Sequence, residues 1–139
     1  MTNIYASCVS WQNKGILFLG KSQMGKSDLC LRLIQDFDSV LVADDRVDLN
    51  VSHETIFASS PRNLRGLLEV RGVGILKLPY NNKCKIDLVV ELVSQSDVER
   101  MPNDCFWSYE DIKIPLLRLY AFEASTPNKI IAALNWSKV

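Results

Sequence analysis

No stretch of this sequence is apolar over enough residues to cross a membrane as a helix. The first residues, 1–5, have neither the charged start nor the apolar run of a secretory signal. Basic residues do not exceed acidic ones, because the chain has 16 of each, and the basic residues form no cluster. Neither a nucleic acid nor a membrane is therefore an expected partner, and we expect a cytoplasmic protein.

Closely spaced cysteine pairs are also missing. Cys8, Cys30, Cys84 and Cys105 are widely separated and form no CxxC motif, so a zinc site is not expected. Cys8 and Cys30 lie in apolar stretches and are predicted to be small core residues. A chain of 139 residues, 47% hydrophobic and 23% charged, predicts a single globular domain over residues 1–139.

The sequence does contain a phosphate-binding pattern. Residues 20–27 match GxxxxGK[ST] at every fixed position, after an apolar run at 16–19 that suits a buried strand. Leu29, Leu33 and Phe37 then recur at helical spacing. Lys26 is expected to reach the outer phosphates and Ser27 to bind Mg²⁺. The alternative is an ordinary glycine-rich turn. The predicted nucleotide cradle is Gly20, Lys21, Ser22, Gln23, Met24, Gly25, Lys26 and Ser27.

Two further segments carry charged side chains next to apolar runs. Asp44 and Asp45 follow the strand-like run 39–43, where a carboxylate can lie beside bound phosphates and metal. If the strand continues, the two side chains point to opposite faces, so that one faces the loop and the other supports it. The alternative is a polar turn. Glu69 and Arg71 are predicted on one face of a strand in apolar surroundings, as a metal ligand or an internal ion pair. Gly72 and Gly74 are expected to permit a close neighbour or a bulge.

The order of elements predicts a mixed α/β fold rich in strands and poor in helices. The turn at 12–15 joins strands at 4–10 and 16–19, the first helix ends near Asp36, and strands at 47–51 and 54–58 form a hairpin. A break or helical turn covers 61–66, and polar residues 94–104 form a short helix or loop. Thr126 and Pro127 begin a terminal helix as its N-cap and first residue. The remaining predicted strands are 39–43, 67–70, 73–78, 84–93 and 112–122, the last an edge strand because of Pro115.

The phosphate-binding loop, the segment 41–45 (LVADD) and the segment 69–74 (EVRGVG) together resemble the HPr kinase/phosphorylase family, which phosphorylates a serine of the phosphocarrier protein HPr. The resemblance covers nearly the whole chain, but only the family's C-terminal catalytic domain. It implies the P-loop kinase core of the HPr kinase and phosphoenolpyruvate carboxykinase type. It also implies ATP and Mg²⁺ as cofactors, and an HPr-like phosphocarrier protein of the phosphotransferase system as partner.

The resemblance further implies residue roles. Asp44 would accept the serine proton with Asp45 beside it, Glu69 would be a second Mg²⁺ ligand after Ser27, and residues 68–77 would line the catalytic centre. Arg100 matches the family's catalytic arginine. A homo-oligomer is left open.

Three departures from the family pattern affect these roles. Tyr5 stands where the family has a histidine, so ready proton exchange near neutral pH is not expected there. Gln23 replaces a glycine common in this loop, and position 23 is therefore predicted to avoid positive φ. The segment 116–119 lacks the loop linked to the phosphorylase reaction, so kinase activity is expected rather than phosphorylase activity. Two alternatives remain: a catalytically impaired nucleotide sensor, and a small-molecule kinase.

Overall fold

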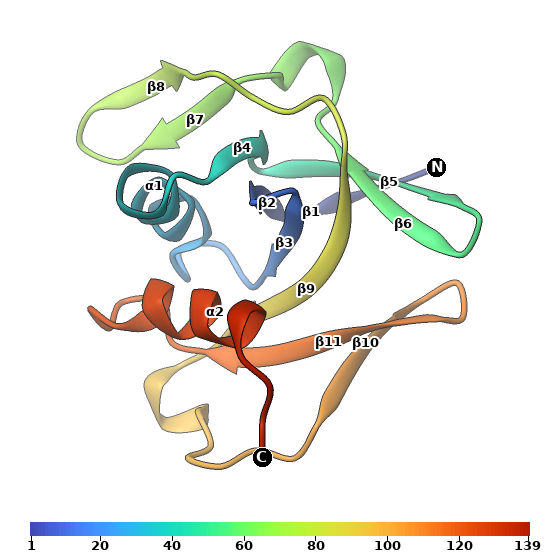
Figure 1. Cartoon of the computed structure of the whole chain (residues 1–139). Coiled ribbons are helices and arrows are strands. Elements are labelled where there is room, and N and C mark those ends of the chain that lie inside the picture. The colour runs from blue at the N-terminus through green and yellow to red at the C-terminus, as the bar shows by residue number, and fades with distance from the viewer.

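The computed structural model describes residues 1–139 as a large curled β-sheet, a small two-stranded sheet and two α-helices (Figure 1). Seven strands of the nine-stranded sheet follow the order β1-β5-β6-β9-β3-β2-β4, and β11 joins β9 with β10 at its outer side. The helices are α1 (Lys26–Phe37) and α2 (Thr126–Asn135), with short 3-10 turns η1 (Arg62–Leu64) and η2 (Gln95–Asp97). No helix is long and apolar enough to cross a membrane. The strands are β1 Thr2–Tyr5, β2 Ser7–Trp11, β3 Lys14–Leu19, β4 Val40–Ala43, β5 Arg46–Ser52, β6 Thr55–Ser59, β7 Leu67–Val70, β8 Gly74–Lys77, β9 Cys84–Leu92, β10 Cys105–Tyr109 and β11 Ile112–Leu119.

The central strands are apolar on both faces because each face covers a separate core. Successive side chains of a strand point to opposite sides of the sheet. In β3, Ile16 and Phe18 therefore pack with α1 and α2, whereas Leu17 packs in the second core, under the curl of the sheet. β9 divides in the same way, with Val90 in the first core and Val89 in the second. Helix α1 contributes buried Leu29, Cys30 and Leu33 to the first core, which fixes the helix on the sheet.

The predicted fold class is confirmed, and so are most local elements. The β2–β3 and β5–β6 hairpins form as expected, and α1 ends at Phe37, one residue beyond the predicted end. Cys8 and Cys30 are fully buried core residues, and all four cysteines are free. Helix α2 begins one residue earlier than predicted, with Ser125 as its N-cap, while the Thr126 hydroxyl donates to the carbonyl of Tyr120.

The predicted first strand is wrong as a single element, because it breaks at Ala6. β1 pairs antiparallel with β5 and ends at Tyr5, whereas β2 begins at Ser7 and pairs with β3 and β4. Ala6 is fully buried at the switch, and its N–H donates to the carbonyl of Asp45 at 3.3 Å. Alternation of side chains does not reveal this switch, since it reports burial and not the identity of the neighbouring strand.

The edge-strand prediction for residues 112–122 is also wrong. β11 lies between β10 and β9, and the strand at 105–109 is not predicted by the sequence. Pro115 is tolerated because it pairs only with Phe106 of β10, and pairing with β9 begins at Leu116. Trp107 and Tyr109 stack with ring centroids 5.6 Å apart on the inner face of β10.

Gly72 and Gly74 were expected to permit a close neighbour, but neither of them has one. A Cβ atom at either position would meet nothing within 4 Å. Both glycines have positive φ, 88° and 133°, and they form the end of the β7–β8 hairpin. This hairpin is a separate two-stranded sheet that lies beside α1 and β4 (Figure 1).

Gly15→Ala is expected to destabilise the fold. The new Cβ would lie 2.2 Å from the carbonyl oxygen of Lys85, so β3 and β9 would have to separate locally. Overpacking of this kind costs about 1–3 kcal/mol. Urea unfolding measures the loss, with exposed Lys113→Ala as a control that should stay within about 0.5 kcal/mol of the wild type. Equal midpoints for the two variants would contradict the close β3–β9 approach.

Candidate active site

The phosphate-binding loop connects β3 to α1, and its backbone turns through two left-handed positions. Gly25, the N-cap of α1, has φ 97°, and Gln23 has φ 68°. The prediction that Gln23 avoids positive φ is therefore wrong, because the loop has to turn there whichever residue occupies the position. Gly25 is further restricted by packing, since a Cβ would lie 2.7 Å from Ala121 and 2.9 Å from the Phe122 ring.

Lys26 begins α1 with its ammonium group folded against the loop. Its Nζ donates to the carbonyl oxygens of Gly20 at 2.7 Å and Lys21 at 3.0 Å. The Tyr5 ring covers the same ammonium with its centroid 4.3 Å away. Lys26 is 6% exposed, so its charge is largely removed from water and the two carbonyls with the aromatic face compensate for it. Tyr5 therefore contacts the cradle through its ring.

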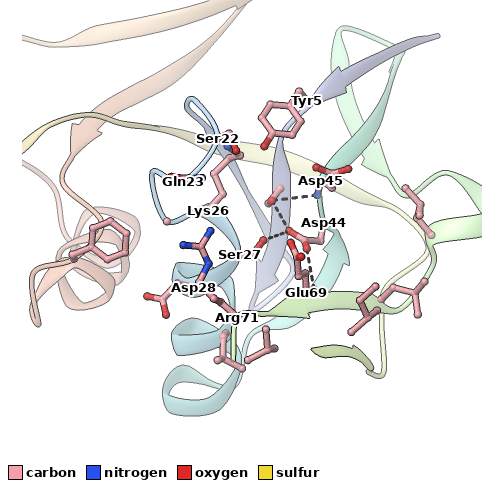
Figure 2. A pocket seen from close by; sticks show the side chains of 18 residues that line it. Tyr5, Ser22, Gln23, Lys26, Ser27, Asp28, Asp44, Asp45, Glu69 and Arg71 are labelled. Atoms are coloured by element: carbon pink, nitrogen blue, oxygen red, sulfur yellow. Dashed lines mark hydrogen bonds between the residues drawn. The ribbon is translucent and has the colours of Figure 1, made fainter. Parts of the chain in front are cut away.

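Asp44 joins three elements through one buried carboxylate. Its Oδ1 accepts from the hydroxyls of Ser7 at 2.8 Å and Ser27 at 2.7 Å, and its Oδ2 accepts from the backbone N–H of Glu69 at 3.3 Å (Figure 2). These donors come from β2, α1 and β7. Asp44 is 6% exposed, and the three bonds supply the compensation that a buried carboxylate needs.

The neighbouring acidic residues are exposed instead. Asp45 has φ 71°, and this left-handed residue turns the chain so that its side chain is open to solvent in the same pocket. One side chain faces the loop as expected, because Asp44 bonds to Ser27, but the strand ends at Ala43 and exposed Asp45 does not support Asp44 from an opposite face. Glu69 was predicted in apolar surroundings with Arg71 on its strand face, which is wrong: Glu69 is exposed, and Arg71 follows the end of β7.

A cavity of about 530 Å³ brings most of these residues together. One side is the loop and the start of α1, and the opposite side is the β7–β8 hairpin, whose Arg71 extends its guanidinium into the pocket (Figure 2). No ion pair or hydrogen bond involves the Arg71 side chain. The lining residues include Tyr5, Ser7, Ser22, Gln23, Gly25, Lys26, Ser27, Asp44, Asp45, Glu69 and Arg71, with Leu31, Leu64, Leu67, Val70, Ile75 and Phe122 as apolar walls.

Four predicted site residues lie outside this lining. Gly20 and Lys21 contribute their carbonyls to Lys26, and Met24 packs against the helix-side core. Arg100 lies after η2 and lines a second hollow of about 230 Å³ together with Arg118 and Lys129. The pocket that holds Lys26 and Asp44 does not include Arg100.

The structure also brings in residues that the sequence analysis did not assign to the site. Ser7 binds Asp44 and lies 3.5 Å from the backbone nitrogen of Asp45 through its Oγ. Arg32 of α1 donates to the carbonyls of Ala121 and Glu123, which holds the Phe122 segment beside the loop. The sequence does not identify Ser7 as a site residue, because a serine in a buried strand matches no functional motif. It does not identify Arg32 either, because the partners of Arg32 lie about 90 residues away in the sequence.

The donor set suits a magnesium ion that shares its coordination with phosphates. No group of three or more histidine, cysteine or acidic side chains is placed to enclose a metal. Mg²⁺ is usually held by one or two protein oxygens together with phosphates and water. Ser27 Oγ and the exposed Glu69 carboxylate, which line the same cavity, fit that kind of site, and Asp44 positions Ser27 through a hydrogen bond of 2.7 Å.

Thiol reagents are expected to distinguish the cysteines. Burial raises the pKa of Cys8 and Cys30 well above the usual range, with the Asp44 charge adding to the effect at Cys30, and it raises the pKa of Cys84 to about 11. Near pH 8 these thiols stay protonated, so half-exposed Cys105 should react first with a disulfide reagent, and Cys105→Ser should remove that fast phase. Fast labelling of Cys30 would show that α1 is not packed as described.

A family model and several relatives match this sequence. The family model for the HPr Serine kinase C-terminal domain matches residues 1–137. An HPr kinase/phosphorylase of Thermoanaerobacter sp. (strain X514) is 33% identical over 128 residues, covering 84% of this chain and 42% of that protein. One from Leptothrix cholodnii is 41% identical over 110 residues, covering 70% of this chain and 33% of that protein. The chain thus spans less than half the length of these relatives.

A solved structure shares the fold. The structure of the Hpr(Ser) kinase/phosphatase from Coxiella burnetii superimposes with a TM-score of 0.83 at 22% sequence identity, covering 96% of this chain and 88% of that one. The family model that covers residues 1–137 and the relatives of more than 30% identity show that this chain belongs to the HPr serine kinase family, to which it corresponds over the C-terminal domain.

Proposed function

We propose that this chain is an ATP- and Mg²⁺-dependent protein serine kinase that acts on the phosphocarrier protein HPr or a relative of it. One observation carries the proposal: Lys26 of the GxxxxGK[ST] loop and the adjacent carboxylates Asp44 and Asp45 line one cavity. The names of its relatives supply the protein acceptor. In this proposal the chain works in the cytoplasm and regulates the phosphotransferase system, and assembly into a homo-oligomer is compatible with it.

The loop side of the cavity would hold the nucleotide. Backbone N–H groups at the start of α1 and the Lys26 ammonium would contact the phosphates, with Lys26 leaving one of its two loop carbonyls to do so. Ser27 and Glu69 would hold Mg²⁺, which supplies neutralisation of phosphate charge. Arg71, with no internal partner, can add a second cation over the transferred group. Arg100 retains its predicted catalytic role only if its loop moves toward the pocket.

The carboxylates would handle the proton of the acceptor. As the serine oxygen bonds to the γ-phosphorus and the bond to the leaving ADP oxygen breaks, Asp44 would accept the serine proton, with Asp45 beside it. The Asp44 oxygens already accept from Ser7, Ser27 and Glu69, and because a carboxylate has about four acceptor positions, the remaining one, on Oδ2, would take the serine proton. Asp45 is exposed in the same pocket and is the second candidate for the base.

A matched pair of variants tests this role. Asp44→Asn is expected to lower phosphoryl transfer about 10²–10⁴-fold, the usual effect of losing a general base, because the amide cannot take the proton. Nucleotide affinity measured by calorimetry shows whether the cradle survives. If Asp45→Asn alone produces that loss and Asp44→Asn does not, the base is Asp45 and Asp44 only positions Ser27.

Tyr5 is expected to act through its ring. Tyr5→Phe keeps the aromatic face over Lys26 and should leave ATP affinity within about twofold, whereas Tyr5→Leu removes the face and should weaken it about threefold or more, by loss of a cation–π contact. ATP titration of the three proteins measures both effects. If the leucine and phenylalanine variants bind ATP with equal affinity, the Tyr5 ring does not contribute to nucleotide binding.

The activity itself is tested with γ-labelled ATP, Mg²⁺ and purified HPr. Serine-linked label on HPr is the expected result, and it should disappear in Lys26→Ala. Tight ATP binding without transfer would favour a nucleotide sensor. Label on small molecules in an extract, and never on protein, would favour a small-molecule kinase.

A further inference from the structure

We propose that the outer face of the β7–β8 hairpin, together with η1, is the surface on which the protein acceptor docks. We further propose that this surface fits an acceptor segment with acidic and apolar side chains around the phosphorylated serine. The inference rests on the proposed kinase function and adds the chemistry of the acceptor. We call this surface the hairpin face and define it by Arg62, Arg65, Leu67, Val73, Ile75 and Lys77.

The segment that carries the hairpin face, residues 61–77, has a positive net charge in a chain without net charge. The segment 61–77 has four basic residues, Arg62, Arg65, Arg71 and Lys77, and one acidic residue, Glu69, which gives +3, against zero for the whole chain. All four basic side chains are exposed. None of them takes part in any of the five ion pairs of the molecule, which all lie in other segments. Unpaired surface cations of one sign attract an acidic partner and speed its encounter.

The same face exposes apolar side chains. Val73 and Ile75 are each 69% exposed. In the hairpin, Leu67 pairs with Lys77 and Glu69 pairs with Ile75, so these four side chains share one face, and the opposite face buries Leu68 completely. The hairpin therefore packs one side onto the core and leaves a mixed apolar and cationic side open. Exposed apolar groups rimmed by charge are typical of a protein interaction surface.

This face is continuous with the catalytic pocket. Leu64, Leu67 and Ile75 line the cavity that also contains Ser27, Asp44 and Asp45. The Glu69 N–H bond to Asp44 Oδ2, 3.3 Å long, ties the hairpin to the carboxylate that faces the acceptor hydroxyl. A serine brought to the carboxylates from outside, with the nucleotide held on the loop side, places its neighbouring residues against the hairpin wall.

The extent of the surface indicates a protein and not a metabolite. Arg62, Arg65 and Val73 do not line the cavity, so a small acceptor contained in it would leave them without contact. A folded acceptor that inserts one serine can cover the wall and these outer residues together. Arg62 and Arg65 would then pair with carboxylates of the acceptor, and Val73 would be buried against it.

The test measures purified HPr as acceptor for four proteins: the wild type, the double variant Arg62→Glu/Arg65→Glu, Val73→Ser and the control Lys113→Glu. Lys113 is exposed on β11 and has no ionic partner, so its reversal changes the net charge by −2 away from the hairpin, against −4 for the two reversals in the double variant. We expect KM for HPr to rise about tenfold or more in the double variant and severalfold in Val73→Ser. ATP affinity and kcat should stay at wild-type values. The difference in KM for HPr between the wild type and the double variant should become smaller as the salt concentration increases.

Direct binding of HPr by calorimetry separates this inference from the proposed function. If no protein transfers phosphate but HPr binds and the hairpin variants weaken that binding, the kinase proposal fails and the docking surface stands. If KM and binding are the same in the double variant and in Lys113→Glu, the docking surface is wrong although the kinase proposal survives. Absence of any HPr binding at millimolar concentration also overturns the docking surface.

Discussion

The site depends on one buried carboxylate. Asp44 collects hydroxyl donors from β2 and α1 and a backbone donor from β7, and these elements make no common hydrogen-bonded sheet. Because an unpaired buried charge is strongly unfavourable, each of the three elements is held at hydrogen-bond distance from the same group. Helix α1 and the β7–β8 hairpin are thereby fixed relative to each other, and the cavity between them keeps its shape.

This arrangement links the proposed metal position to the proposed acceptor side. Ser27, the predicted Mg²⁺ ligand, shares Oδ1 of Asp44 with Ser7, and the hairpin is attached to Oδ2 of the same carboxylate. A change in the bonding of Asp44 when nucleotide enters would therefore act directly on the hairpin backbone. Preorganised charge and geometry account for most of what a protein can contribute to phosphoryl transfer, so the rigidity of this junction matters more than the number of side chains in it.

Local sequence patterns predicted the parts of the site that lie in one continuous segment. The loop at 20–27, the strand before it and the helix after it follow from spacing alone, and so does the position of Asp44 after an apolar run. The exposure of Asp45 does not follow from alternation, because the strand ends at Ala43 and a left-handed φ of 71° turns the chain at Asp45. The environment of Glu69 was missed because an apolar neighbourhood in sequence does not report which face of a hairpin is covered.

Three further omissions share a cause, which is long-range pairing. Ala6 changes sheet partner, β10 joins β11, and Ser7 meets Asp44 across a gap of 37 residues. Each of these contacts is decided by which strands become neighbours, and side-chain periodicity does not encode that choice. The docking role proposed for the hairpin was not predicted for the same reason, since its cations and apolar residues appear in the sequence as an ordinary mixed segment. They form a surface only because Leu68 anchors the opposite face and Asp44 holds the backbone beside the pocket.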